Sequence, residues 1–272
     1  MWEQRFEKSR LKVKENLYVK FYKPIAKLIY PPCKTVVKEE LTDEPAVYLC
    51  NHSAANGPAI MSMYFKKPHK TWMISYAMDK KRGPNYFFHD GFFGRSRKCK
   101  WFFRLLSKIV MPLLRPLLKM GDPILVYHDR RIMDTFHQSL DALSEGKSLL
   151  IFPESPVKFS EFVHKLYDGF ADIGRMFFTE TGKLLKFYPV YVERQNRMIN
   201  IGKPITFDPT VPAREQRKTI AEYIQTSIDA LARELPPHKP VPFLPDIWYK
   251  YYGEYEHDVA SYWKLFESTY SE

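Results

Sequence analysis

Short apolar runs alternate along the chain with longer segments of mixed polarity. Runs of four to nine residues bounded by Gly, Pro, Asn or charged residues predict strands, and periodic mixed segments predict helices. The expected strands cover 46–50, 71–76, 123–127, 148–152, 184–192 and 198–201, and the expected helices cover 58–65, 132–143, 170–179 and 214–235. This alternation predicts an α/β fold with a mixed, mostly parallel sheet covered by helices.

The two ends of the chain differ from this central pattern. Residues 1–32 mix aromatic and aliphatic side chains with Lys and Arg and end at Pro31-Pro32, which predicts a basic amphipathic helix that lies either at a membrane interface or packed on the domain surface. Residues 236–272 begin with five prolines in ten residues and continue as an acidic, aromatic segment. We therefore expect an α/β domain over 33–235, preceded by the helix and followed by a C-terminal appendage.

Composition limits where the protein is expected to work. A hydrophobic content of 45% in 272 residues is typical of a folded chain. The three cysteines form neither a disulfide framework nor a zinc pattern, which fits a reducing compartment. No apolar signal-peptide core and no run of 18 apolar residues occurs. We expect a cytoplasmic protein, peripheral on the inner face of a membrane.

Positive charge is concentrated in one segment. Residues 66–119 contain 14 Lys and Arg against two acids, a net charge of +12, whereas 246–272 carry a net charge of −4. Such a field attracts lipid surfaces, nucleic acids or phosphorylated ligands. No nucleic acid is expected as partner, because the cations flank aliphatic runs and no nucleic-acid module accompanies them.

The segment 101–118 is mostly apolar but is interrupted by three cations and two prolines. A spanning helix would bear a cost for each central cation, whereas a segment lying in the membrane plane would not. The alternative is a pair of helices packed on the core with exposed cations. Because cations and aromatics coincide, we expect contact with an anionic membrane surface. The expected contact residues are Trp101, Phe102, Phe103, Arg104 and Lys108.

A histidine follows the apolar run 46–50. Asn51-His52 ends that run, and the small residues Asn56-Gly57-Pro58 then predict a tight turn and the start of a helix. Imidazole is the one side chain whose ordinary pKa lies near neutral pH, so His52 is a candidate proton carrier. The alternative is a half-buried histidine whose nitrogens are bound by the backbone.

Polar groups follow two further predicted strands, namely Asp129-Arg130 and Pro153-Glu154-Ser155. Open α/β sheets bind ligands at the carboxyl ends of their strands, so these groups and His52 are expected to converge. A histidine base, an arginine that matches a phosphate and a glutamate suit transfer onto a hydroxyl near a phosphate.

Six short motifs also occur in the order found in the glycerol-phosphate/lysophosphatidate acyltransferase family, which the chain resembles over about residues 45–235. They are Asn51-His52, Tyr127-His128-Asp129-Arg130, Phe152-Pro153-Glu154, Asp168-Gly169-Phe170-Ala171, Tyr188-Pro189-Val190 and Ile201-Gly202-Lys203-Pro204-Ile205. The resemblance implies transfer of an acyl chain from acyl-CoA or acyl-carrier protein to a hydroxyl of a lysophospholipid or glycerol phosphate. It implies neither a metal nor a resident cofactor.

The resemblance also implies roles for individual residues. His52 is the general base for the acceptor hydroxyl, Arg130 binds the acceptor phosphate, and Glu154 lines the substrate pocket. Their neighbours Asn51 and Ser155 belong to the same substrate-binding set, as does Gly57.

The chain departs from the family pattern at two places. The acid that orients the family's histidine falls at Gly57, and the Gly-Thr of the third motif falls at Ser155-Pro156. In serine proteases, replacing the orienting Asp lowers turnover about 10⁴-fold. Asn56 can orient the ring through its amide oxygen but offers no charge. The other candidate acids are Asp129 and Glu154.

Two functions from different classes follow. The chain is either an acyltransferase in which Asn56 or a distant acid supports His52, or a protein that binds lipid or acyl chains without turnover. The retention of His52, Arg130 and Glu154 favours the enzyme.

Overall fold

The computed structural model describes residues 24, 26–88, 99–155 and 162–243. It divides into a unit of residues 1–32 and a unit of residues 33–272. In the first unit residues 26–29 are helical, and the Tyr30 amide donates to the Ala26 carbonyl at 2.7 Å. The rest of the expected N-terminal helix, and the C-terminal appendage beyond residue 243, lie outside the described residues.

The second unit alternates strands and helices. Its strands are β1 (Lys34–Val37), β2 (Val47–Cys50), β3 (His69–Ile74), β4 (Ile124–Val126), β5 (Ser148–Ile151), β6 (Lys186–Glu193), β7 (Met198–Ile201) and β8 (Ile205–Thr206). Its α-helices are α3 (Asn56–Tyr64), α4 (Gly83–Phe87), α5 (Lys100–Met120), α6 (Ile132–Ser144), α7 (Asp172–Thr181) and α8 (Ala213–Arg233). Two 3-10 helices, η1 (Ser75–Met78) and η3 (Gly169–Ala171), follow β3 and precede α7.

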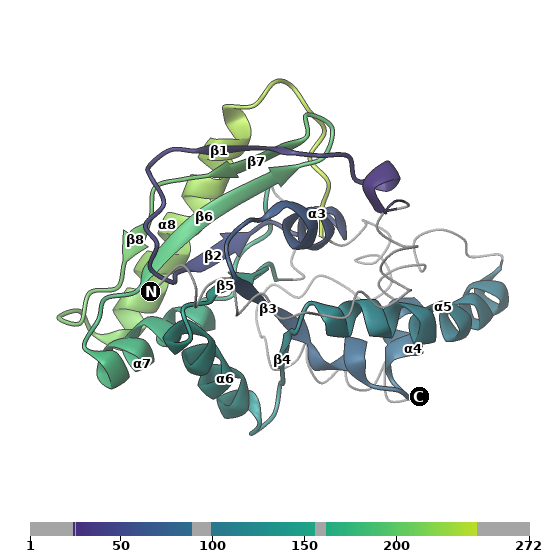
Figure 1. The fold of residues 1–272 in the computed structure, drawn as a ribbon, viewed down its shortest axis with the longest axis horizontal. Helices are drawn as coiled ribbons and strands as arrows, with labels where there is room; N and C mark the ends of the chain where they lie inside the picture. Colours follow the sequence, from purple (N-terminus) through teal and green to yellow (C-terminus); the bar gives the residue numbers. More distant parts are fainter. Residues whose placement is uncertain (1–23, 25, 89–98, 156–161, 244–272) are drawn as a thin grey trace, which may run out of the picture. The chain divides into compact units, whose positions relative to one another are not determined.

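The strands form one sheet in the order β1-β7-β6-β2-β5-β3-β4, with β8 paired to β6 (Figure 1). Strands β6, β2, β5, β3 and β4 run parallel, as do β1 and β7. Strand β6 is antiparallel to β7 and β8. The expected mixed, mostly parallel α/β fold is therefore confirmed. Because β2 and β5 are parallel neighbours, His52 and Glu154 follow strands that end at the same edge.

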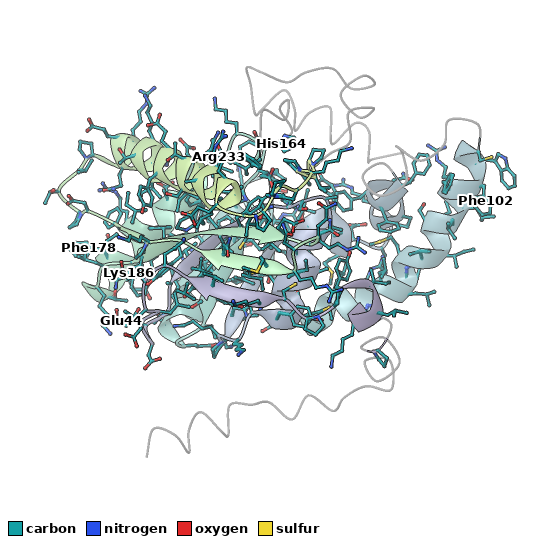
Figure 2. The ribbon with its side chains drawn as sticks, turned by 90° about the horizontal axis from the view of Figure 1, so that it is seen from above. Glu44, Phe102, His164, Phe178, Lys186 and Arg233 are labelled. Atoms are coloured by element: carbon teal, nitrogen blue, oxygen red, sulfur yellow. The ribbon has the colours of Figure 1, made fainter. Side chains whose placement is uncertain are left out.

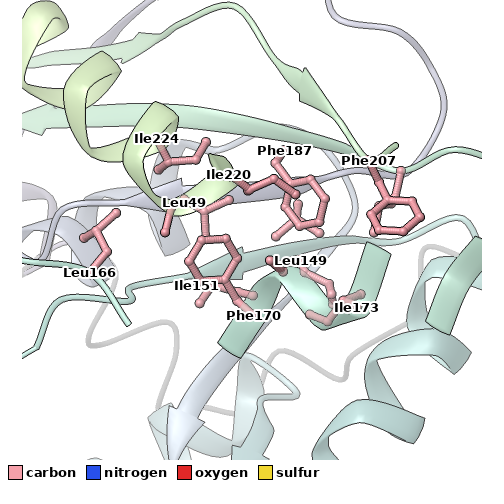
Figure 3. Close-up of a cluster of buried hydrophobic side chains, with 14 of the residues drawn as sticks. Leu49, Leu149, Ile151, Leu166, Phe170, Ile173, Phe187, Phe207, Ile220 and Ile224 are labelled. Carbon is pink, nitrogen blue, oxygen red and sulfur yellow. The ribbon is translucent and has the colours of Figure 1, made fainter. Parts of the chain in front are cut away.

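Alternate residues of the central strands point to opposite faces of the sheet. On one face, Leu49, Leu149 and Phe187 join a buried cluster with side chains of α6, α7 and α8, including Ile173 and Ile224 (Figure 3). This cluster is the main hydrophobic core.

The opposite face is covered by α3. Tyr48 stacks on Tyr188 with ring centroids 5.0 Å apart and meets the edge of Phe65 at 4.7 Å. Ile60 and Met61 of α3 are fully buried. Helix α3, which begins four residues after His52, is therefore fixed by its own apolar packing.

The segment 101–118 forms a single helix and not the pair of helices considered above as the alternative to membrane contact. It lies within the single helix α5, with Pro112 and Pro116 inside. Each proline removes one backbone donor. Ser107 and Met111 are buried in the middle of α5, which packs on α4 and η1, and this packing holds the helix continuous.

Candidate active site

Asn51 fixes the end of β2. Its side-chain amide donates to the Val192 carbonyl at 3.1 Å, and its amide oxygen accepts from the Val192 N–H at 2.7 Å. The side chain is almost fully buried. This two-point contact ties β2 to β6 immediately before His52, so Asn51 serves the framework of the site.

The chain turns sharply after His52. Ser53 and Ala54 both have positive φ angles, 47° and 55°, a left-handed conformation that is uncommon for residues other than glycine. The Gly57 amide then donates to the His52 carbonyl at 2.8 Å. A Cβ atom at position 57 would lie 2.1 Å from the Asn51 carbonyl oxygen. Position 57 is thus closed to any side chain.

Glu154 lies next to His52 and is buried. One carboxylate oxygen accepts from the His52 backbone N–H, and the other accepts from the His164 N–H at 2.9 Å. The first oxygen is 3.8 Å from His52 Nδ1, longer than a hydrogen bond. Burial raises the pKa of Glu154 to about 7, and the two backbone donors partly oppose that shift.

This raised pKa predicts a specific dependence of stability on pH. The native state holds the Glu154 proton up to about pH 7, whereas the unfolded chain releases it near pH 4.5, so the wild type loses stability as pH rises between these values. A shift of this size corresponds to about 3 kcal/mol. Glu154→Gln does not titrate, so its free energy of unfolding relative to wild type should rise by about that amount from pH 4 to pH 8.

Urea unfolding at several pH values measures this difference. Glu180→Gln, which removes an exposed carboxylate from α7, is the control and should show no comparable change. If the difference in free energy of unfolding between Glu154→Gln and wild type does not change with pH, the raised pKa of Glu154 is contradicted.

The His52 ring lies between two aromatic side chains. Phe243 stacks on it with ring centroids 4.0 Å apart and planes 22° apart, and Phe152 lies at 5.2 Å. Only 19% of the side chain is exposed. Burial lowers the pKa of His52 to about 3, and the nearby His164 adds to the shift. The ring is therefore neutral at physiological pH.

No described residue makes a hydrogen bond to Nδ1 of His52. Asn56 is the first residue of α3, and its amide nitrogen lies 3.5 Å from the Ser53 hydroxyl. The structure therefore does not pair Asn56 with His52.

Ser155 completes the turn after β5. Its backbone N–H and its hydroxyl both donate to the Lys165 carbonyl, at 2.8 and 2.6 Å. Glu154 also forms a β-bridge with Leu166. The Ser155 side chain thus stabilises the loop that carries Glu154.

Arg130 follows a strand that is not adjacent to β2. It follows β4, which lies three strands from β2 across the sheet, a separation of about 14 Å at the usual strand spacing. The Arg130 side chain is exposed. Asp129 accepts from the backbone and side chain of Arg131, which lowers its pKa to about 2. Of the three strand ends that carry the expected residues, those of β2 and β5 are adjacent in the sheet.

Several residues near His52 carry no sequence signal that would have identified them. His164 and Phe243 belong to no motif, although both contact the site. A cavity of about 320 Å³ adjoins the turn after His52. It is lined by Ser53, Asn56, Tyr191, Glu193, Arg194, Gln195, Lys239 and Val241.

Helix α5 presents an apolar stripe to solvent. Trp101, Leu105, Ile109 and Leu113 recur every four residues and are 71%, 52%, 55% and 42% exposed. Of the other expected membrane-contact residues, Phe102, Arg104 and Lys108 are exposed and Phe103 is half-buried. Figure 2 labels Phe102 on this helix. None of the helices that the structure describes is long and apolar enough to cross a membrane.

Comparisons with known proteins do not assign the chain to a family. No family model matches it, and no curated protein matches its sequence. Among solved structures it is similar to the crystal structure of a 1-acyl-sn-glycerophosphate (LPA) acyltransferase from Thermotoga maritima. The two share 14% sequence identity, the match covers 85% of this chain and 88% of that chain, and the TM-score is 0.44. A likeness this distant assigns no function.

Proposed function

We propose that the chain transfers a fatty acyl group from acyl-CoA or acyl-carrier protein to a hydroxyl of a lysophospholipid or glycerol-phosphate-like acceptor. The observation that carries the proposal is the position of the buried Glu154 beside His52 at neighbouring strand ends, where its carboxylate accepts from the His52 backbone N–H and lies 3.8 Å from Nδ1. The motif resemblance of the sequence supplies the reaction class. The proposal requires no metal or resident cofactor.

The reaction needs one proton carrier. The acceptor oxygen attacks the thioester carbonyl carbon while His52 takes the hydroxyl proton. The carbon–sulfur bond then breaks, and His52 returns the proton to the departing thiolate. Because Nδ1 faces Glu154 at 3.8 Å, Nε2 is the nitrogen that acts as base. Glu154 suits the orienting role better than Asp129, whose carboxylate is bound to Arg131.

The acceptor phosphate is proposed to be bound by Arg130, as the motif resemblance implies. Two alternatives, Arg194 and Lys239, line the cavity beside the turn that follows His52. Single Ala variants of these three residues distinguish a phosphate site at Arg130 from one at the cavity. The cation that binds the phosphate is the one whose loss raises KM for a phosphate-bearing acceptor but not for its dephosphorylated analogue.

A second candidate function is binding of lipid or acyl chains without turnover. The observation that favours it is the covered His52, whose lowered pKa makes it a weak base. An acyl-transfer assay of the wild type with both donors and a range of lysophospholipids distinguishes the two functions. Turnover above the uncatalysed rate supports the enzyme, whereas lipid binding with no turnover supports the second function.

Membrane contact is proposed to occur through α5, where cations flank the exposed apolar stripe. A basic side chain near an anionic bilayer contributes about 1 kcal/mol, so Arg104→Gln with Lys108→Gln should weaken vesicle binding about 30-fold. Flotation with phosphatidylglycerol vesicles at low salt measures this change. Arg214→Gln with Lys218→Gln removes the same charge at the same spacing from exposed positions of α8 and is the control. Equal binding by both pairs would contradict docking through α5.

A further inference from the structure

The segment 236–243, called the strap here, crosses the candidate site after α8. Figure 1 shows it, in yellow, running from the end of α8 back toward α3. We propose that the strap closes the site in the free protein, with Phe243 holding the place of the acyl chain beside His52, and that an acyl ligand displaces it. The identity of the displacing ligand rests on the proposed function. The closure itself does not.

Hydrogen bonds attach the strap to three parts of the site. His238 Nε2 lies 2.8 Å from the Tyr191 hydroxyl on β6, and the Lys239 N–H donates to the Gln195 side chain at 3.2 Å. Nearer His52, the Pro242 carbonyl accepts from the Ala54 N–H at 3.1 Å, within the left-handed turn. Phe243 is therefore carried to His52 by contacts along the whole strap.

The last contacts involve the two histidines of the site. The Phe243 N–H donates to His164 Nε2 at 3.0 Å, so this ring nitrogen is the acceptor that holds the end of the strap. The Phe243 ring then lies parallel to His52 at 4.0 Å and edge-on to His164 at 6.3 Å. The same His164 donates its backbone N–H to Glu154. The strap thus ends on His52 and on His164, the residue whose backbone N–H is bonded to Glu154.

The Phe243 side chain occupies the space beside the His52 imidazole. The lone pair of a histidine base lies in the ring plane, so the stacked Phe243 ring does not occupy the nitrogen itself, but it covers one face of the imidazole and restricts the approach of a reagent or substrate to that nitrogen. The thioester and the chain attached to it, however, must lie within contact distance of the base and its acceptor hydroxyl. An aromatic ring at 4.0 Å fills an apolar position there. The ligand that fits the same position is an alkyl chain.

The strap is suited to leave and return. Four of its eight residues are proline, which restricts the conformations it adopts when detached. Lys239 and Val241 are exposed, and neither adds apolar packing comparable to that of Phe243. The lowered pKa of His52 agrees with a covered ring and should rise when the strap departs.

Accessibility of His52 tests the closure without any assay of turnover. The full-length chain is treated with diethyl pyrocarbonate, and modification of His52 is followed by peptide mass spectrometry. Phe243→Ala should raise the rate at least tenfold, and Phe243→Tyr should leave it near that of the wild type. Phe102→Ala removes an exposed ring from α5 and is the control for this labelling rate. A wild-type rate in a folded Phe243→Ala variant would overturn the proposal.

A second arm identifies the displacing ligand. Chymotrypsin cleavage after Phe243 in the wild type should accelerate at least fivefold with a non-hydrolysable long-chain acyl-CoA thioether, and not with CoA alone. Acceleration by CoA alone, or by neither compound, would overturn the assignment of Phe243 as holder of the acyl position. If the thioether binds and the strap is displaced but no acyl transfer is observed, the strap proposal stands and the acyltransferase proposal is rejected. The two proposals therefore fail separately.

Discussion

Replacement of His52 by Gln is expected to lower acyl transfer about 10³-fold and leave the protein folded. Loss of a positioned general base removes about 10²- to 10⁴-fold from turnover. Gln retains bulk between Phe152 and Phe243, so the aromatic packing suffers less than with Ala. Turnover at saturating donor and acceptor measures the effect.

His137→Gln is the matched control, because His137 is exposed on α6. It should retain wild-type turnover and thermal stability. Turnover of His52→Gln within tenfold of wild type would show that another group removes the acceptor proton. The Glu154→Gln variant, tested in the same assay, would then identify whether the carboxyl acts directly.

The second large effect is expected from placing an acid at position 57, where the motif resemblance of the sequence expects one. Gly57→Asp should lower the free energy of unfolding by about 4 kcal/mol or more and should fail to raise turnover. The cause is the Cβ atom, which would lie 2.1 Å from the Asn51 carbonyl oxygen and 2.8 Å from the His52 carbonyl oxygen. Both neighbours are backbone atoms at the end of β2, so relief requires α3 to move away from the sheet.

Thermal and urea unfolding measure this loss, with a decrease in Tm of about 8–16 °C for a domain of this size. Gly57→Ala should lose nearly as much stability as Gly57→Asp, because both add the clashing atom. Gly169→Ala is the control, since a Cβ there meets nothing within 4 Å. A Gly57→Asp protein with wild-type stability and faster turnover would contradict the closed position.

The sequence predicted those parts of the fold that have a local signal. The runs at 46–50 and 148–152 match β2 and β5 closely, because fully buried strands are continuously apolar. Strand β1 was missed because three of its four residues are exposed, and β8 because it has two residues. Helix α5 continues through two prolines because packing on α4 and η1 outweighs the lost hydrogen bonds, which no local pattern reveals.

Only the site residues that directly follow a predicted strand could be identified from the sequence. His52 and Glu154 follow strong apolar runs, and their convergence needed only that β2 and β5 be parallel neighbours. The same reasoning placed Arg130 with them, but the order of strands in a sheet is a long-range property and β4 lies at the far edge. Phe243 reaches His52 across 191 positions of sequence, so no spacing rule identifies it.

The close approach of α3 to the end of β2 also has an evolutionary consequence. A glycine codon and an aspartate codon can differ by one nucleotide, so an acid at position 57 can be a single mutational step away. The contacts of position 57 with the Asn51 and His52 carbonyls make that step harmful until the helix has first shifted. Selection for a stable fold is therefore expected to keep a glycine at position 57.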